Sequence, residues 1–291
     1  MFRIGIIGSD NSHAEIFSKL VNIPDEKTGA YAYPDMRVTA IFGLDKTRTE
    51  EVAAHGKIEM IAQRPEELLN QVDAAMVVFR HGDLHLPYAL PFIEAGIPVW
   101  LDKPFTITNQ DVQKLKSAAI AHGTLITGGS TCKYTPDVLN LRSVVTQENR
   151  IGSLRAAAVN FPATLANEYG GIYFYGAHLV EMALAIFGYQ PRSVTANENN
   201  GGVVALVNYD QFQVALNFLP DTTPYGAILY GHKGTMSKEI DISGCYRYGF
   251  AQFAEMLRTG KSPTSFEQIE TPVKLLNAIK ESYETKRAVI L

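Results

Sequence analysis

The stretch MFRIGIIGSDNSH, residues 1–13, decides the fold of this chain. Residues 2–7 are a short, mostly apolar run that ends at Gly8, as a buried parallel strand does. Ser9, Asp10, Asn11 and Ser12 come next and favour the N-terminus of a helix, which we predict over residues 14–21. Strand, glycine turn and helix in this order open a βαβ unit.

The same alternation continues along the first half of the chain. It predicts further strands over residues 37–42, 74–79, 98–101 and 124–127, and further helices over residues 47–55, 86–95 and 109–122. Strands and helices that alternate with short connections form a doubly wound parallel sheet. Residues 1–128 are therefore predicted to be an α/β Rossmann domain, which binds dinucleotides.

After about residue 135 the regular alternation of strands and helices ends. Strand-like segments lie at residues 154–161, 202–207, 212–218 and 227–230, and the last three follow one another with little helix between them. This pattern predicts an α+β domain over residues 129–291 with a large, mostly antiparallel open sheet. Helices are expected over residues 177–187, 248–257 and 273–284, and the last of these is left free to pack back on the first domain.

Composition limits the function classes. The net charge is −4, 46% of the residues are hydrophobic, and Lys and Arg are scattered, so the chain lacks the basic surface of a nucleic-acid or membrane-surface binder. Cys132 and Cys245 are far apart in sequence, which argues against a disulfide framework or a zinc site. No stretch reads as a signal peptide or a membrane span. We expect a cytoplasmic protein whose partner is a small molecule.

A Rossmann domain places the pyrophosphate of its cofactor against the glycine turn and the helix that follows. Gly8 occupies the first glycine of G-x-G-x-x-G, whereas Asp10 and His13 stand at the other two positions. The predicted cofactor loop consists of Gly8, Ser9, Asp10, Asn11, Ser12 and His13. The acidic residue that usually ends the second strand and binds the ribose is replaced by Gly43.

The choice between NAD and NADP stays open. Asp45 lies two residues beyond Gly43 and is placed to reach the ribose of NAD. Alternatively, the gap admits the 2′-phosphate of NADP, with Lys46 or Arg48 to neutralise it. A third reading makes these residues solvated loop charges.

Several motifs beyond the glycine turn occur in a fixed order. These are His85 before the helix LPYALPFIEAG (86–96), the strand PVWL (98–101) with Asp102-Lys103-Pro104, Gly176-Ala177-His178 with Glu181, and the turn at residues 230–235. This succession resembles the glucose-fructose oxidoreductase/inositol dehydrogenase (Gfo/Idh/MocA) family, which has Glu where Asp102 stands. The resemblance spans nearly the whole chain and is specific in combination.

The resemblance implies an NAD(P)-dependent oxidoreductase that transfers a hydride between the nicotinamide and a sugar, polyol or sugar-derived substrate. It implies that Lys103 stabilises the reacting oxygen and that His178 is the acid/base. The further cofactor residues that it implies are Asp45, Arg80, His81, His85, Asp102 and Lys103. The substrate residues that we expect are Lys133, Tyr134, Tyr173 and Tyr175, although the tyrosines are equally typical of an apolar interface. No metal site is expected.

The chain also departs from the family pattern. Phe174 stands where the family often has an aspartate that orients the histidine, and the hydroxyl of Tyr173 or Tyr175 is the candidate substitute. Arg80-His81 replaces the family's Thr-Pro along the cofactor. These changes, together with Asp10, favour one alternative, a non-catalytic ligand-sensing relative. A further alternative, which the resemblance implies because its chemistry is known in relatives, is an NAD-dependent glycosidase. The open sheet further predicts a homo-oligomer, a dimer or tetramer packed through that sheet.

Overall fold

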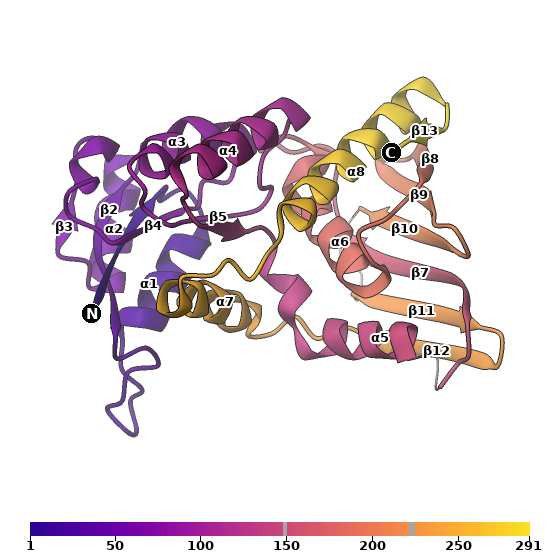
Figure 1. Ribbon diagram of the computed structural model, residues 1–291, viewed down its shortest axis with the longest axis horizontal. Coiled ribbons are helices and arrows are strands. Elements are labelled where there is room, and N and C mark those ends of the chain that lie inside the picture. Colours follow the sequence, from indigo (N-terminus) through magenta and orange to yellow (C-terminus); the bar gives the residue numbers. More distant parts are fainter. Residues whose placement is uncertain (148–149, 221–224) are drawn as a thin grey trace. The chain divides into compact units, whose positions relative to one another are not determined.

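The computed structural model describes residues 1–147, 150–220 and 225–291, which divide into two compact units (Figure 1). Unit 1 comprises residues 1–106, 110–129 and 246–266. Unit 2 comprises residues 107–109, 130–245 and 267–291.

Unit 1 is built on a six-stranded sheet in the order β3-β2-β1-β4-β5-β6, in which all paired strands are parallel. The predicted doubly wound parallel sheet is confirmed. One strand, β3, was missed because two residues are too short to carry a hydrophobic pattern. The strands are β1 (Phe2–Ile7), β2 (Met36–Phe42), β3 (Met60–Ile61), β4 (Ala74–Val77), β5 (Val99–Leu101) and β6 (Ile126–Gly128).

Helices cover both faces of this sheet, with α3 and α4 on one side and α1 and α7 on the other (Figure 1). Phe17 of α1 and Trp100 of β5 are fully buried, and their ring centroids lie 6.0 Å apart. The helices of this unit are α1 (Ser12–Asn22), α2 (Lys46–Gly56), η1 (Pro65–Leu68), η2 (Gly82–Leu84), α3 (His85–Glu94), α4 (Asn109–His122) and α7 (Cys245–Thr259).

Unit 2 contains a seven-stranded sheet in the order β12-β11-β7-β10-β9-β8-β13, and only its central pair β7–β10 is parallel. The predicted mostly antiparallel sheet is therefore confirmed. The strands are β7 (Leu154–Pro162), β8 (Ser193–Asn199), β9 (Gly202–Asn208), β10 (Gln213–Leu219), β11 (Gly226–Gly231), β12 (Gly234–Glu239) and β13 (Val289–Ile290). Its helices are η3 (Thr131–Tyr134), α5 (Pro136–Gln147), α6 (Ile172–Phe187) and α8 (Phe266–Thr285).

The helix that rejoins unit 1 is α7, whereas the last helix, α8, belongs to unit 2. The reason is aromatic packing: Phe250 and Phe253 of α7 are fully buried, next to Phe17 and Trp100. The first unit thus runs to Gly129, one residue beyond the expected boundary, and takes up residues 246–266 as well. A continuous second domain over residues 129–291 does not describe this arrangement.

Candidate functional site

The turn after β1 brings the backbone close to β4. Gly8 has φ of +107°, and a Cβ atom there would lie 2.8 Å from the backbone nitrogen of Phe79. Its own N–H donates to the carbonyl of Phe42 at 2.8 Å. Both the dihedral angle and the space require glycine, so the predicted turn residue is in place.

The end of β2 has no room for a side chain. A Cβ atom on Gly43 would collide with Ser9 Oγ and Thr49 Oγ1, which are 2.8 Å apart and buried. Asp45 instead caps α2, because its Oδ1 accepts the N–H of Arg48 at 2.9 Å. An acidic side chain at the usual ribose position is therefore sterically excluded, and Ser9 points away from solvent into this packing.

The two basic candidates for a 2′-phosphate differ in their surroundings. The guanidinium of Arg48 forms ion pairs with Glu15 and Glu51, each at 3.1 Å. The side chain of Lys46 is 84% exposed and lies 3.8 Å from Glu50. Arg48 is thus already neutralised within the protein, whereas Lys46 remains largely in water.

Asp10 places a carboxylate in the cofactor loop. Its Oδ2 accepts the backbone N–H of Arg80 at 3.2 Å, whereas its Oδ1 is buried and has no hydrogen-bond partner among the described residues. Ser12 is exposed at the start of α1. An anion that approaches this helix N-terminus meets the favourable helix dipole and also the charge of Asp10.

His13 forms a buried pair with Asp102. Its Nδ1 lies 2.5 Å from Asp102 Oδ2, and Asn11 Nδ2 donates to the same oxygen at 3.3 Å. Burial raises the pKa of Asp102, but the imidazole of His13 and the charge of Lys103 outweigh it and hold this pKa below its usual value. The pair fastens the first turn of α1 to the segment after β5, which carries Lys103.

His85 joins two loops from a fully buried position. Its Nε2 lies 2.9 Å from the carbonyl oxygen of Phe79, and its Nδ1 lies 3.2 Å from that of Phe105. Burial lowers the pKa of His85, so the imidazole is neutral near pH 7. His81 is partly exposed, and its Nδ1 accepts the N–H of Asp83 at 3.3 Å. The two histidines therefore differ. His85 holds the backbone of two loops together, whereas His81 lies at the surface.

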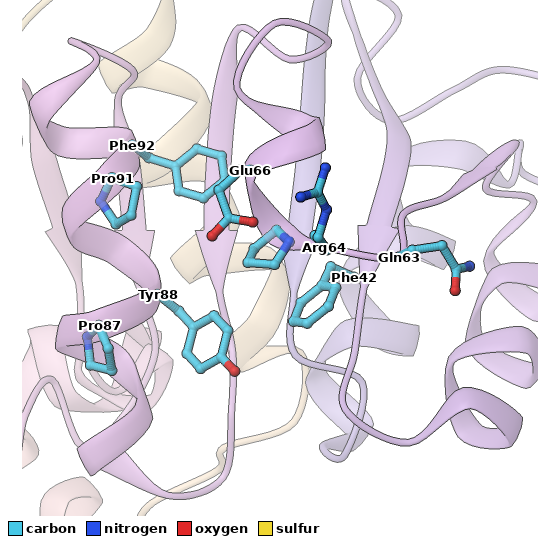
Figure 2. A pocket seen from close by; sticks show the side chains of 9 residues that line it. Phe42, Gln63, Arg64, Glu66, Pro87, Tyr88, Pro91 and Phe92 are labelled. Atoms are coloured by element: carbon cyan, nitrogen blue, oxygen red, sulfur yellow. The ribbon is translucent and has the colours of Figure 1, made fainter.

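A pocket of about 460 Å³ opens beside the end of β2. The rings of Phe42 and Tyr88 are stacked, with centroids 5.8 Å apart and planes 28° apart. Figure 2 shows these two rings beside the segment that carries Gln63 and Arg64. Flat aromatic walls with a few polar groups suit a heteroaromatic ring. The pocket is lined by Phe42, Gln63, Arg64, Pro65, Glu66, Pro87, Tyr88, Pro91 and Phe92.

Unit 2 holds His178, in the second turn of α6, in a polar network. Its Nδ1 lies 2.7 Å from Ser130 Oγ, and its ring stacks on Phe161 at 5.4 Å. Glu181, one turn further along α6, accepts the backbone N–H of Ser130 at 2.8 Å and the ammonium of Lys133 at 2.7 Å. Burial opposes the charge of Lys133, but Glu181 outweighs it and raises the pKa of Lys133 well above its usual value.

The hydroxyl that meets His178 is thus that of Ser130, which the sequence did not point to. Ser130 follows two glycines with positive φ, Gly128 at the end of β6 and Gly129 after it, and nothing in that turn indicates a site. The Tyr173 hydroxyl donates to Asn277 at 2.9 Å. Tyr175 is 42% exposed, with its ring 6.3 Å from the ring of His178.

Tyr134 and Phe174 border the same network. The ammonium of Lys133 lies 5.1 Å from the ring centroid of Tyr134. Phe174 packs between the rings of Tyr169 and Tyr175, at 4.9 and 4.6 Å. The predicted substrate residues therefore cluster around the first turns of α6, with Lys133 buried in an ion pair and Tyr175 at the surface.

Comparison with known proteins supports the resemblance. Residues 2–130 match the model of the oxidoreductase family with an NAD-binding Rossmann fold, Gfo/Idh/MocA. The predicted resemblance to this family of nicotinamide-dependent oxidoreductases is thereby confirmed.

Named relatives and solved structures agree with this assignment. A scyllo-inositol 2-dehydrogenase (NADP(+)), IolW, of Bacillus subtilis is 22% identical, over 99% of this chain and 96% of the relative. A putative myo-inositol dehydrogenase from Sinorhizobium meliloti has a TM-score of 0.83 at 17% identity and matches 100% of this chain and 99% of that one. A scyllo-inositol dehydrogenase from Lactobacillus casei, solved with NAD(H) and scyllo-inositol, has a TM-score of 0.82 at 14% identity over 100% and 99%.

Unit 1, which matches the Gfo/Idh/MocA family model, has the features that a dinucleotide site needs. Gly8 gives the close backbone approach, α1 supplies a helix N-terminus, and the Phe42–Tyr88 pocket suits an adenine ring. The carboxylate of Asp10 is the one feature described above that opposes a pyrophosphate. The family fold thus keeps the shape of its cofactor site while its loop chemistry has changed.

The two cysteines lie together in unit 2 although they are far apart in sequence. Cys132 and Cys245 are both buried as free thiols, and their contact, together with burial, raises the pKa of Cys132 well above its usual value.

The residues that the structure describes contain no cluster of three or more His, Cys, Asp or Glu side chains arranged to hold a metal ion. Nor does any helix among them have the length and apolar character needed to cross a membrane.

Proposed function

We propose that the protein is an NAD(P)-dependent dehydrogenase that oxidises a secondary hydroxyl of an inositol or a related polyol. The observation that carries this proposal is the buried contact of His178 Nδ1 with Ser130 Oγ at 2.7 Å, which holds the imidazole in one orientation. The relatives named as inositol dehydrogenases point to the substrate class.

A nicotinamide dinucleotide, when bound, supplies the hydride acceptor. The protein's own task is then to remove the hydroxyl proton and to stabilise the charge that develops on the substrate oxygen. We assign the proton to His178 Nε2 and the stabilising hydrogen bond to the ammonium of Lys103. Lys103 follows β5, and ligands of open α/β sheets bind at the carboxyl ends of the strands.

We assign the remaining residues by where they lie. We assign the backbone of residues 8–12 to the pyrophosphate, whereas His13, His85 and Asp102 hold the segments that carry this loop and Lys103. Arg80, His81 and Asp45 border the cofactor. We assign Tyr175 and Tyr134 to the border of the substrate. Lys133 and Tyr173 do not contact the substrate in this assignment; they hold Glu181 and Asn277 in place through hydrogen bonds.

The test is cofactor binding followed by turnover. NADH and NADPH are titrated while nicotinamide fluorescence and melting temperature are followed, since a ligand that binds the folded state raises the latter by mass action. Oxidation of scyllo-inositol, myo-inositol and other polyols is then measured for the wild type and for Lys103→Ala. A folded Lys103→Ala protein that retains wild-type kcat contradicts the proposal.

Two observations favour a second function, a non-catalytic ligand sensor. Asp10 puts a carboxylate with one unpartnered oxygen in the phosphate loop, and Phe174 stands where a carboxylate would orient the histidine. The sensor function predicts that neither NADH nor NADPH binds at millimolar concentration. Micromolar binding with turnover excludes it.

We also propose that the protein is cytoplasmic and forms a homo-oligomer through the open sheet of unit 2. The register of the strands aligns one row of side chains across four neighbouring strands: Leu206, Ala215, Ala158 and Ile228. Val204, Leu206 and Tyr230 on this face are 51%, 38% and 43% exposed. A row of apolar side chains in water is typical of a surface that a second copy covers.

A further inference from the structure

We propose that the protein selects NADP(H) over NAD(H), and that Arg64 binds the 2′-phosphate by which the two cofactors differ. The inference rests on the proposed function and deepens it, because it names the cofactor and the residue that recognises it. It follows from the packing around Gly43, the register of β2 with β3, and the surroundings of the basic side chains near this edge of unit 1.

The packing around Gly43 removes the usual determinant of NAD binding. In a dinucleotide-binding domain, an Asp or Glu at the end of the second strand accepts hydrogen bonds from the ribose hydroxyls of NAD, and its charge repels a 2′-phosphate. At residue 43 such a side chain would collide with the buried hydroxyls of Ser9 and Thr49. The next carboxylate, that of Asp45, caps α2 by accepting the N–H of Arg48 at 2.9 Å, where the helix dipole offsets its charge. The end of β2 therefore carries no acidic side chain that would keep a 2′-phosphate out.

The register of β2 and β3 brings Arg64 to the same edge of the sheet. Ile41 pairs with Ile61 in parallel, and the N–H of Ala62 donates to the carbonyl of Ile41 at 2.9 Å. The chain therefore leaves β3 toward Arg64 at the edge at which it leaves β2 toward Gly43. Arg64 also lines the pocket of about 460 Å³ that suits an adenine ring. One residue thus borders both the expected adenine pocket and the strand edge where the adenosine ribose is expected.

The surroundings of the basic side chains distinguish Arg64 from its neighbours. Arg48 is already neutralised by two ion pairs, and Lys46 does not belong to the residues that line the pocket. The Nε of Arg64 donates to Glu67 Oε1 at 3.4 Å, whereas its two terminal nitrogens donate no hydrogen bond within residues 1–147, 150–220 and 225–291. Arginine binds a phosphate with N–H groups that lie in one plane, so Arg64 keeps the groups that this contact needs.

Glu67 holds the segment that carries this arginine. Its Oε2 accepts the backbone N–H of Gln63 at 3.1 Å, while its Oε1 accepts Nε of Arg64. One carboxylate thus orders both the backbone before the arginine and the base of the guanidinium. A side chain that is partly ordered before binding loses less conformational entropy when the ligand arrives.

Glu66 offers the opposite interpretation of the same pocket. It is the only carboxylate among the described residues that line the pocket, and a carboxylate accepts hydrogen bonds from the ribose hydroxyls of NAD. However, Glu66 lies inside η1, two residues further from β3 than Arg64. In Figure 2 it stands on the side of Phe92, whereas Arg64 stands on the side of Phe42. The ribose is expected at the end of β2, so this placement favours Arg64 and a phosphate.

The first test measures cofactor selectivity and needs no substrate. NADPH and NADH are titrated into the wild type while nicotinamide fluorescence is followed. Adenosine 2′,5′-bisphosphate and 5′-AMP, which differ only in the 2′-phosphate, are then used as competitors. We expect NADPH to bind about 10- to 100-fold more tightly than NADH, the effect of one hydrogen-bonded charge pair, and the bisphosphate to compete better than 5′-AMP. Equal binding of the two cofactors, or tighter binding of NADH, overturns the proposal.

The second test identifies the residue. Arg64→Gln removes a charge from a largely exposed side chain, so the fold is expected to persist, which the melting temperature checks. We expect this variant to lose about 10- to 100-fold in NADPH affinity, with little change in NADH affinity. Lys46→Gln is the matched control, because it removes a basic side chain that follows β2 but does not line the pocket. It is expected to keep the preference for NADPH. Loss of that preference in Lys46→Gln and not in Arg64→Gln overturns the assignment of Arg64.

Glu66→Gln decides between the two interpretations of the pocket. We expect it to leave NADH affinity unchanged and to strengthen NADPH binding, because it removes a negative charge near the phosphate. Weaker NADH binding in Glu66→Gln, beside a wild type that prefers NADH, would instead make this an NAD site. A wild type that prefers NADH and oxidises a polyol refutes this inference alone. A wild type that binds neither cofactor at millimolar concentration refutes the proposed function together with it.

Discussion

His13 Nδ1 and Asp102 Oδ2 lie 2.5 Å apart, and both side chains are buried. The two residues are 89 positions apart in the chain, at the start of α1 and just after β5. Their contact therefore ties the predicted cofactor loop to the segment of Lys103. Since His13 stands where the dinucleotide fingerprint has its third glycine, the substitution that weakens the fingerprint also builds this contact.

The His13–Asp102 pair makes a prediction about stability. We expect His13→Asn to lower the free energy of unfolding at pH 7 by about 3–5 kcal/mol, because it leaves a buried carboxylate without its partner. His55→Asn is the matched control: His55 is 55% exposed and lies 3.1 Å from Glu15, so its loss is expected to cost at most about 1 kcal/mol. Denaturant titration measures both, and equal losses would contradict a stabilising buried contact between His13 and Asp102.

The same pair predicts a pH dependence. The pKa of Asp102 is lower in the folded protein than in the unfolded chain, so ionised Asp102 stabilises the fold above about pH 4 and this contribution is lost as the pH falls further. We therefore expect the wild type to lose more stability between pH 5 and pH 3 than Asp102→Asn does. Equal acid sensitivity of the two proteins would show that Asp102 titrates alike in both states.

The Lys133–Glu181 pair makes a second prediction about stability. Both side chains are buried, so Lys133→Met is expected to cost about 3–5 kcal/mol, and the double change Lys133→Met with Glu181→Met is expected to recover part of that loss. Arg192→Met serves as the control, because Arg192 and Asp210 are 58% and 66% exposed. Because the pKa of Lys133 is raised, its contribution holds below about pH 10 and is lost only above it. A double variant less stable than Lys133→Met argues against a buried charge pair.

Cys132 and Cys245 predict a chemical outcome. Burial and mutual contact raise the pKa of Cys132, so the reactive thiolate is scarce at pH 7–8. We expect a thiol reagent such as Ellman's reagent to label neither cysteine in the folded protein and both in guanidinium. Rapid labelling of the native protein at the rate of a free thiol would contradict this. Cys132→Ser and Cys245→Ser identify which thiol reacts.

The fold was predictable because its signals are local. Apolar runs such as residues 74–79 and 98–101 end at turns and mark buried parallel strands whatever lies beside them. β3 spans only Met60–Ile61 and β13 only Val289–Ile290, so neither repeats often enough to show a period. The return of α7 to unit 1 depends on contacts of Phe250 and Phe253, which no local pattern reveals.

The candidate site was predictable in part for the same reason. Gly8 is identified by the strand before it and the helix after it. Ser130 is not, because its role depends on His178, which lies 48 residues further along the chain. In the sequence, Gly43 only indicates that the acidic residue that usually binds the ribose is missing. The structure shows the reason, because Ser9 and Thr49 occupy the space that a side chain at residue 43 would need. Side-chain contacts between distant segments are what the sequence alone did not supply.

The open face of the unit 2 sheet makes the last prediction. Leu206 lies in the apolar row that crosses β9, β10, β7 and β11, so a carboxylate there would remain buried and unpaired between two copies. We expect the wild type to run as a multiple of 32.0 kDa by light scattering at micromolar concentration, and Leu206→Asp to run as a monomer. Ile120→Asp is the control, because Ile120 is a 60% exposed apolar residue on α4 of unit 1 and lies outside this row. A monomeric wild type contradicts the predicted oligomer outright. Dissociation of Ile120→Asp alone would instead place the interface on unit 1.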